Sequence, residues 1–206
     1  MTAHWFAALN PALPPITALR RFLREAGRVE TLRHVSRVAV TARRLARRFD
    51  LSIEQSDVAC VAHDLAAVVP ARDIITCAEQ LGLALTAADR AAPQVLHGPV
   101  AAEIIRVRLN VKDEAVLDAV RYHTTLRAGA APLEQLVFIA DKIDYDPTTR
   151  HTGFHPPLME AVRAHVPLPA LCWIYIEWAV REGPELGWML HPHLLAAYAE
   201  LKQMGK

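Results

Sequence analysis

Apolar residues recur at three- and four-residue steps between Leu32 and Phe49, and this periodicity constrains the fold more than any other feature of the chain. The apolar positions are Leu32, Val35, Val38, Ala39, Ala42, Leu45, Ala46 and Phe49. Such spacing places one apolar stripe along an α-helix. No segment of the chain shows the alternating pattern of a strand over a useful length. The sequence therefore predicts an all-α fold, a compact helical bundle.

Turn and cap residues divide the rest of the chain into further helices. Ser52, with Gln55 three residues later, resembles a capping box. Expected helices cover residues 17–27, 71–81, 86–92, 113–124, 133–143, 158–165, 169–181 and 192–203, one more opens near residue 94, and a loop covers 144–157. Residues 1–16 are expected to form an irregular lead-in, and residues 17–206 a single domain.

Charge and cysteine usage exclude several classes of function. The net charge is +1, which argues against a nucleic-acid or membrane-surface partner. Five arginines flank the apolar stripe (Arg37, Arg43, Arg44, Arg47 and Arg48), and we interpret them as a solvated helix face rather than an anion-binding surface. Three widely separated cysteines fit reduced thiols, and we find neither a signal peptide nor a membrane span. We expect a cytoplasmic protein.

A His-Asp pair lies inside the apolar stretch 58–66. Burying His63 and Asp64 is costly unless something pairs with them, and a divalent metal ion satisfies both. Asp141 lies in a second apolar stretch, and Lys142 is a poor partner because neighbours on a helix point about 100° apart. His34 lies near the start of the amphipathic helix that carries the apolar stripe. Taken singly, each position also fits a boundary histidine or a solvated carboxylate, and only tertiary packing can bring them together.

The order His34, His63-Asp64, Asp141 resembles the HD-domain phosphohydrolase superfamily. Three further motifs resemble its YqeK branch: residues 96–100 (LHGPV), residues 121–125 (RYHTT) and residues 138–143 (FIADKI). Members of that branch are symmetrical bis(5′-nucleosyl)-tetraphosphatases, which split diadenosine tetraphosphate into two ADP. The resemblance implies a dinucleoside polyphosphate or another nucleotide as substrate.

The resemblance also implies a two-metal centre. Its ligands would be His34, His63, Asp64, His97, His123 and Asp141, with Asp64 bridging the two ions. Two ions sharing a water lower its pKa and clamp the attacked phosphoryl group. Nitrogen and oxygen ligands without thiolate favour iron or manganese over a structural zinc, and the resemblance implies iron as the first choice. Asp64 and Lys142 would serve catalysis, and Lys142 and Arg127 would contact the polyphosphate.

Several positions depart from the YqeK pattern. Ala67 stands where that branch usually has a cation, and the segment from Asp144 to Arg150 is longer than usual, with Arg150 as a substitute cation. Two alternatives therefore stay open: another nucleotide phosphohydrolase such as a nucleotidase, and a nucleotide-binding regulator with little activity. The aromatic segment Leu171–Tyr175 fits either the core or the face of a homodimer, and the core is preferred.

Overall fold

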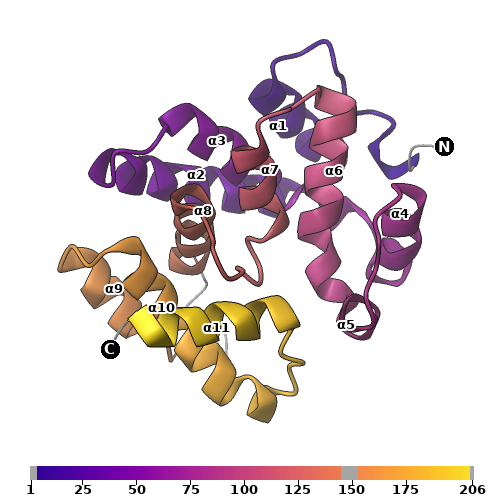
Figure 1. Ribbon diagram of the computed structural model, residues 1–206. Helices are drawn as coiled ribbons and strands as arrows, with labels where there is room; N and C mark the ends of the chain where they lie inside the picture. Colours follow the sequence, from indigo (N-terminus) through magenta and orange to yellow (C-terminus); the bar gives the residue numbers. More distant parts are fainter. Residues whose placement is uncertain (1–3, 145–152, 205–206) are drawn as a thin grey trace.

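The computed structural model describes residues 4–144 and 153–204, and within them every regular element is helical (Figure 1). This confirms the all-α prediction. The first half of the chain contributes α1 (Pro15–Glu25), α2 (Val29–Arg48), α3 (Ile53–Ala62), α4 (Ile74–Gln80), α5 (Ala87–Ala91) and α6 (His97–Leu109). The second half contributes α7 (Glu114–Arg121), α8 (Pro132–Ile143), α9 (His155–Arg163), α10 (Leu168–Glu182) and α11 (Pro192–Met204). No described helix has the length and apolarity that a bilayer crossing requires.

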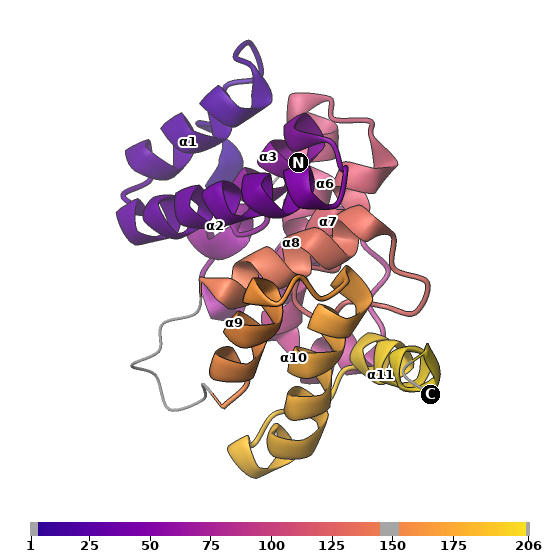
Figure 2. The ribbon, with the colours of Figure 1, turned by 90° about the vertical axis from the view of Figure 1, so that its left-hand side faces the viewer.

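The centre of the molecule is formed by α2, α3, α7 and α8. Helix α2 buries its apolar stripe against α3 and α8, and α7 packs on α3, α6 and α8 (Figure 2). Helices α9, α10 and α11 cover the far side of α8, while α4, α5 and α6 lie at the opposite end (Figure 1). Apolar burial between these layers supplies the main stabilising term of the fold.

The predicted cap at Ser52 is present in part. Ser52 Oγ accepts a hydrogen bond from the Gln55 backbone N–H at 3.2 Å and starts α3. The side chain of Gln55 does not return the bond, because its amide donates to Asp113 Oδ2 at 2.7 Å. A complete capping box is formed instead by Thr86 and Asp89 at the start of α5.

The arginine face of α2 is less solvated than we expected. Arg43 forms a two-pronged ion pair with Asp57 at 2.7 and 2.8 Å. Arg48 donates to the carbonyl of Val162 at 2.7 Å. Arg37 pairs with Asp144. Arg37 keeps the exposure expected of a solvated face, with 59% of its side chain exposed, whereas Arg43 and Arg48 are half-buried. All three side chains join α2 to other parts of the bundle.

Two predicted boundaries also need correction. Helix α7 ends at Arg121, so His123 lies in the following turn rather than inside the helix. There the imidazole of His123 bonds the Val120 carbonyl, which competes with continuation of the helical ladder. The predicted loop 144–157 should end earlier, because α9 begins at His155. Its prolines do not prevent this, since proline is well tolerated in the first turn of a helix. Arg150 lies outside the described residues.

Candidate metal centre

Five separate elements bring the six predicted ligands to one place. His34 lies on α2, Asp141 on α8, and His63 caps the C-terminus of α3 with Asp64 directly after it. The remaining two are His97, the first residue of α6, and His123, in the turn after α7. Two groups have ligand atoms that all lie within 4.8 Å of one another: His34, His63 and Asp141, and His63, Asp64 and His123.

Backbone carbonyls orient three of the four imidazoles. Nδ1 of His63, His97 and His123 lies 2.8, 2.6 and 2.8 Å from the carbonyl oxygens of Cys60, Gln94 and Val120, respectively. A carbonyl only accepts, so Nδ1 must carry the proton, and in a neutral ring Nε2 then presents a lone pair. Nε2 of His97 and of His123 are only 2.8 Å apart, and the same atoms of His34 and His63 only 3.3 Å. Lone pairs that face each other at such distances repel, and a cation bound by both nitrogens would remove this repulsion.

The two oxygens of Asp64 face different histidines. Oδ2 lies 3.6 Å from Nε2 of both His34 and His63. Oδ1 lies 3.4 Å from Nε2 of His97 and 3.8 Å from Nε2 of His123. The Asp64 carboxylate therefore lies between two pairs of histidines: His34 and His63, from α2 and the end of α3, and His97 and His123, from α6 and the turn after α7.

Both aspartates stay ionised although they are partly shielded, with 26% of the Asp64 side chain and 18% of the Asp141 side chain exposed. Burial would raise the pKa of Asp141, but Lys142, His34 and His63 outweigh it and hold that pKa well below its ordinary value. Burial likewise opposes ionisation of Asp64, and His63, His97 and His123 lower its pKa. Ionised carboxylate is the form that binds a metal ion.

The histidines differ in basicity. Burial lowers the pKa of His63, but Asp64 and Asp141 outweigh it and raise the pKa to about 9. The pKa of His123 lies well below its ordinary value because of burial and because His97 and His63 are close. In the metal-free protein His123 is therefore already in the neutral form that binds a metal ion, whereas His63 must lose a proton when a cation binds.

Asp144 and Arg37 belong to the centre and were missed by the sequence analysis. Asp144 Oδ2 accepts a hydrogen bond from His34 Nδ1 at 2.7 Å, and the Arg37 guanidinium holds the same carboxylate at 2.8 and 2.9 Å. A carboxylate behind a ligating histidine fixes its tautomer and orientation. A signal was available, because Asp144 follows Asp141 and Arg37 follows His34 by three residues, one helical turn in each case.

Lys142 is buried beside the cluster, and the prediction that it is a poor partner for Asp141 was wrong, because its long side chain reaches back to that carboxylate. Its Nζ lies 2.7 Å from Asp141 Oδ2 and 3.3 Å from the His123 carbonyl, and only 6% of the residue is exposed. Burial lowers the pKa of Lys142, but Asp141 outweighs this effect and the pKa ends above its ordinary value. Lys142 is thus a fixed positive charge next to a proposed ligand, and its contact with substrate stays a prediction.

Arg127 already has carboxylate partners. Its guanidinium donates to Glu134 at 2.7 and 2.9 Å and to Asp118 at 2.9 Å, and it lies 4.6 Å from the centre of the Tyr122 ring. These contacts join the loop after α7 to the start of α8. A substrate contact of Arg127 stays a prediction, since polyphosphate would have to compete with both carboxylates.

The HD-domain family model matches residues 31–146, more than half of the chain and a range that includes all six proposed ligands. This chain belongs to the HD-domain family. Together with the His and Asp cluster, the match identifies an HD-domain phosphohydrolase with residues suited to a metal site.

Known relatives agree with this family. An uncharacterized protein in the pepC 5′ region of Lactococcus lactis subsp. cremoris is 30% identical over 74% of this chain and 75% of its own length. The symmetrical bis(5′-nucleosyl)-tetraphosphatases of Bacillus subtilis and Staphylococcus aureus are 34% and 35% identical over 54% of this chain. The matched segment spans 59% and 57% of these two enzymes.

A solved HD-domain structure has the same fold. The crystal structure of a predicted HD superfamily hydrolase involved in NAD metabolism from Clostridium acetobutylicum superposes with a TM-score of 0.81 at 26% identity. The superposition covers 90% of this chain and 96% of that one. The similarity therefore extends beyond the range of the family model.

Proposed function

We propose that the chain is a metal-dependent hydrolase of nucleotide phosphoanhydrides, and that its reaction is the symmetrical cleavage of diadenosine tetraphosphate to two ADP. The observation that supports this most strongly is the convergence of imidazole lone pairs around Asp64. The named activity of the B. subtilis and S. aureus relatives supports the choice of substrate.

The donor set fits a pair of divalent cations. His34, His63 and Asp141 would hold one ion, His97 and His123 the other, and Asp64 would bridge them. Nitrogen and oxygen donors without thiolate suit iron or manganese, and iron is our first choice because the chain resembles the YqeK branch. When bound, such ions supply Lewis-acid stabilisation of the phosphate oxygens and lower the pKa of the attacking water.

The side chains of this chain perform distinct tasks around that chemistry. The carbonyls behind three imidazoles, and Asp144 behind His34, keep each Nε2 aimed at the centre. Lys142 remains protonated at neutral pH and contributes positive charge beside Asp141. In the proposed reaction, water attacks one of the two central phosphorus atoms and the central P–O–P bond breaks. The second ADP leaves with the bridging oxygen, and a proton is released.

Product analysis tests the proposal. Purified protein supplied with Fe²⁺ or Mn²⁺ is incubated with diadenosine tetraphosphate, and the nucleotides are separated by chromatography. ADP alone is the expected product. A mixture of ATP and AMP would refute symmetrical cleavage, and tight binding without turnover by metal-replete protein would favour a regulator. Metal analysis of the isolated protein accompanies the assay.

A different nucleotide is the second candidate, and the surroundings of Ala67 favour it. Ala67 is exposed and lines a largely apolar pocket of about 260 Å³ that also touches His97 and Gln94. A cation expected there to neutralise a long polyphosphate is missing. Parallel assays with nucleoside mono-, di- and triphosphates separate the two candidates, because a nucleotidase would release inorganic phosphate from them.

A further inference from the structure

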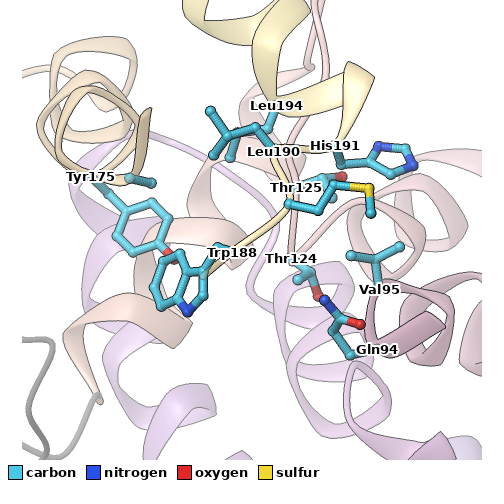
Figure 3. A pocket seen from close by; sticks show the side chains of 11 residues that line it. Gln94, Val95, Thr124, Thr125, Tyr175, Trp188, Leu190, His191 and Leu194 are labelled. Atoms are coloured by element: carbon cyan, nitrogen blue, oxygen red, sulfur yellow. The ribbon is translucent and has the colours of Figure 1, made fainter. Parts of the chain in front are cut away.

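A pocket of about 300 Å³ lies beside the proposed metal centre (Figure 3). Its walls come from the turn after α7, from the short helix that precedes α6, and from α10, α11 and the segment between them. The volume is at the lower end of the roughly 300–1,000 Å³ found for ligand pockets. A small, flat group would fill it.

Two residues that line the pocket contact proposed metal ligands. Thr124 lines the pocket, and its Oγ1 lies 3.1 Å from Nε2 of His123 and 3.3 Å from Nε2 of His97. Gln94 also lines the pocket, and its backbone carbonyl is the one that orients His97. A ligand whose phosphate lies at the histidines could therefore place its next group in this pocket.

The lining suits an aromatic ring. Figure 3 shows the rings of Tyr175 and Trp188 on one side and Val95 and His191 on the other. Tyr175 is held in place by edge-to-face contacts with Phe138 and Phe154, at 5.4 and 4.8 Å between ring centres. Rings fixed in this way can stack on a nucleobase without losing further freedom.

Polar groups gather at one side of the pocket. Figure 3 places the carboxamide of Gln94 beside Thr124, away from Leu190 and Leu194. A glutamine carboxamide matches adenine well, because its oxygen accepts from the N6 amino group while its NH₂ donates to N7. Guanine carries an acceptor at the equivalent position and cannot make the same pair.

We infer that this pocket binds the adenine base of one half of the substrate, stacked against Trp188 and Tyr175 and recognised by Gln94. The inference rests on the proposed function, because it assumes that a nucleotide phosphate lies at the histidines. It adds a selection for adenine that the metal ligands themselves cannot provide.

Binding measurements on the full-length, metal-replete protein test the inference. ADP, GDP and pyrophosphate are titrated calorimetrically into the natural protein and into Trp188→Ala, Gln94→Leu and Trp173→Ala. Trp173 is the matched control, since it is also a tryptophan near α11 but stacks on Tyr198 outside the pocket. Gln94 is exposed, so its replacement should not disturb folding.

Trp188→Ala should weaken ADP binding about tenfold or more, as expected for loss of one stacking partner, while pyrophosphate binding stays unchanged. Gln94→Leu should reduce the preference for ADP over GDP by about tenfold. Equal losses of ADP affinity in Trp188→Ala and Trp173→Ala would overturn the inference, as would an ADP/GDP preference that Gln94→Leu leaves intact.

The reaction and the pocket can fail separately. Cleavage of diadenosine tetraphosphate by a protein that binds ADP no better than pyrophosphate would refute the pocket and leave the reaction standing. Base-dependent binding of ADP that Trp188→Ala abolishes, without cleavage of diadenosine tetraphosphate, would support the pocket and refute the reaction.

Discussion

Removing the carboxylate of Asp144 should weaken metal binding while leaving the fold intact. Asp144 is the hydrogen-bond acceptor behind His34, at 2.7 Å, and its side chain is 12% exposed. Loss of a carboxylate behind a ligating histidine typically costs about 10- to 100-fold in metal affinity, or roughly 1.4–2.7 kcal/mol. His34 stays in place but loses the contact that aims its Nε2.

The cost in folding stability should be much smaller. The Asp144→Ala protein also loses the ion pair with Arg37, whose side chain is 59% exposed, and such pairs contribute about 1 kcal/mol or less. Asp57→Ala is a matched control, because Asp57 is equally shielded and is held by Arg43 of the same helix in the same two-pronged manner. Neither Asp57 nor Arg43 is among the proposed ligands.

Two measurements separate the effects. Mn²⁺ affinity is measured by competition with a chelator, and unfolding is followed by circular dichroism in the absence of metal. We expect similar small losses of stability in both variants, and weaker Mn²⁺ binding in Asp144→Ala alone. The reasoning is refuted if Asp57→Ala weakens Mn²⁺ binding as much, or if Asp144→Ala binds Mn²⁺ as tightly as the natural protein.

Three further predictions follow from the same geometry. Asp64→Ala should abolish stoichiometric metal content and activity together, as elemental analysis and the ADP assay would reveal; a variant that keeps its metal contradicts the bridging role. The pKa of His63 is raised to about 9, so the metal-free protein should lose stability as pH rises from about 6.5 to 9. Loss of the same proton strengthens metal binding. The rise in Tm that metal induces should therefore grow between these two pH values. The pKa of His123 is lowered, so this residue is neutral throughout that pH range and reduces the stability of the protein only at lower pH. A metal-induced rise in Tm that becomes smaller as pH rises would contradict the prediction. Gly98→Ala should lower Tm and metal affinity, because an added Cβ would lie 2.7 Å from the Arg121 carbonyl and 3.2 Å from Nδ1 of His123; calorimetry and metal titration measure both, and an unchanged Tm would mean that α6 and α7 can separate freely.

The sequence was sufficient to predict the helical class and the approximate position of most helices. Apolar periodicity predicts α2 because its stripe is long and continuous. Side-chain competition with the backbone is harder to foresee, and for this reason the end of α7 before His123 was predicted wrongly. The early start of α9 at His155 was missed for a different reason, because its prolines were interpreted as loop residues.

The candidate site could be predicted only where motifs carried the information. The six proposed ligands fall within recognisable motifs and converge in the structure. Asp144 and His34 are 110 residues apart, so their contact follows from tertiary packing and not from local spacing. The carboxylate partners of Arg127 depend on how the loop after α7 meets α8, which no sequence pattern specifies.

The aromatic side of the pocket and the histidine cluster are encoded by different parts of the chain. All six proposed ligands lie within residues 31–146, whereas Tyr175 on α10, Leu194 on α11 and Trp188 between these helices lie beyond that range. Substitutions at Tyr175 or Trp188 would therefore change how a base is stacked without touching a single ligand, whereas Gln94, which would choose the base, lies between the ligands in the sequence. If the pocket binds a base as we infer, the C-terminal cover of this chain can vary its contacts to that base while the histidine cluster beneath it stays the same.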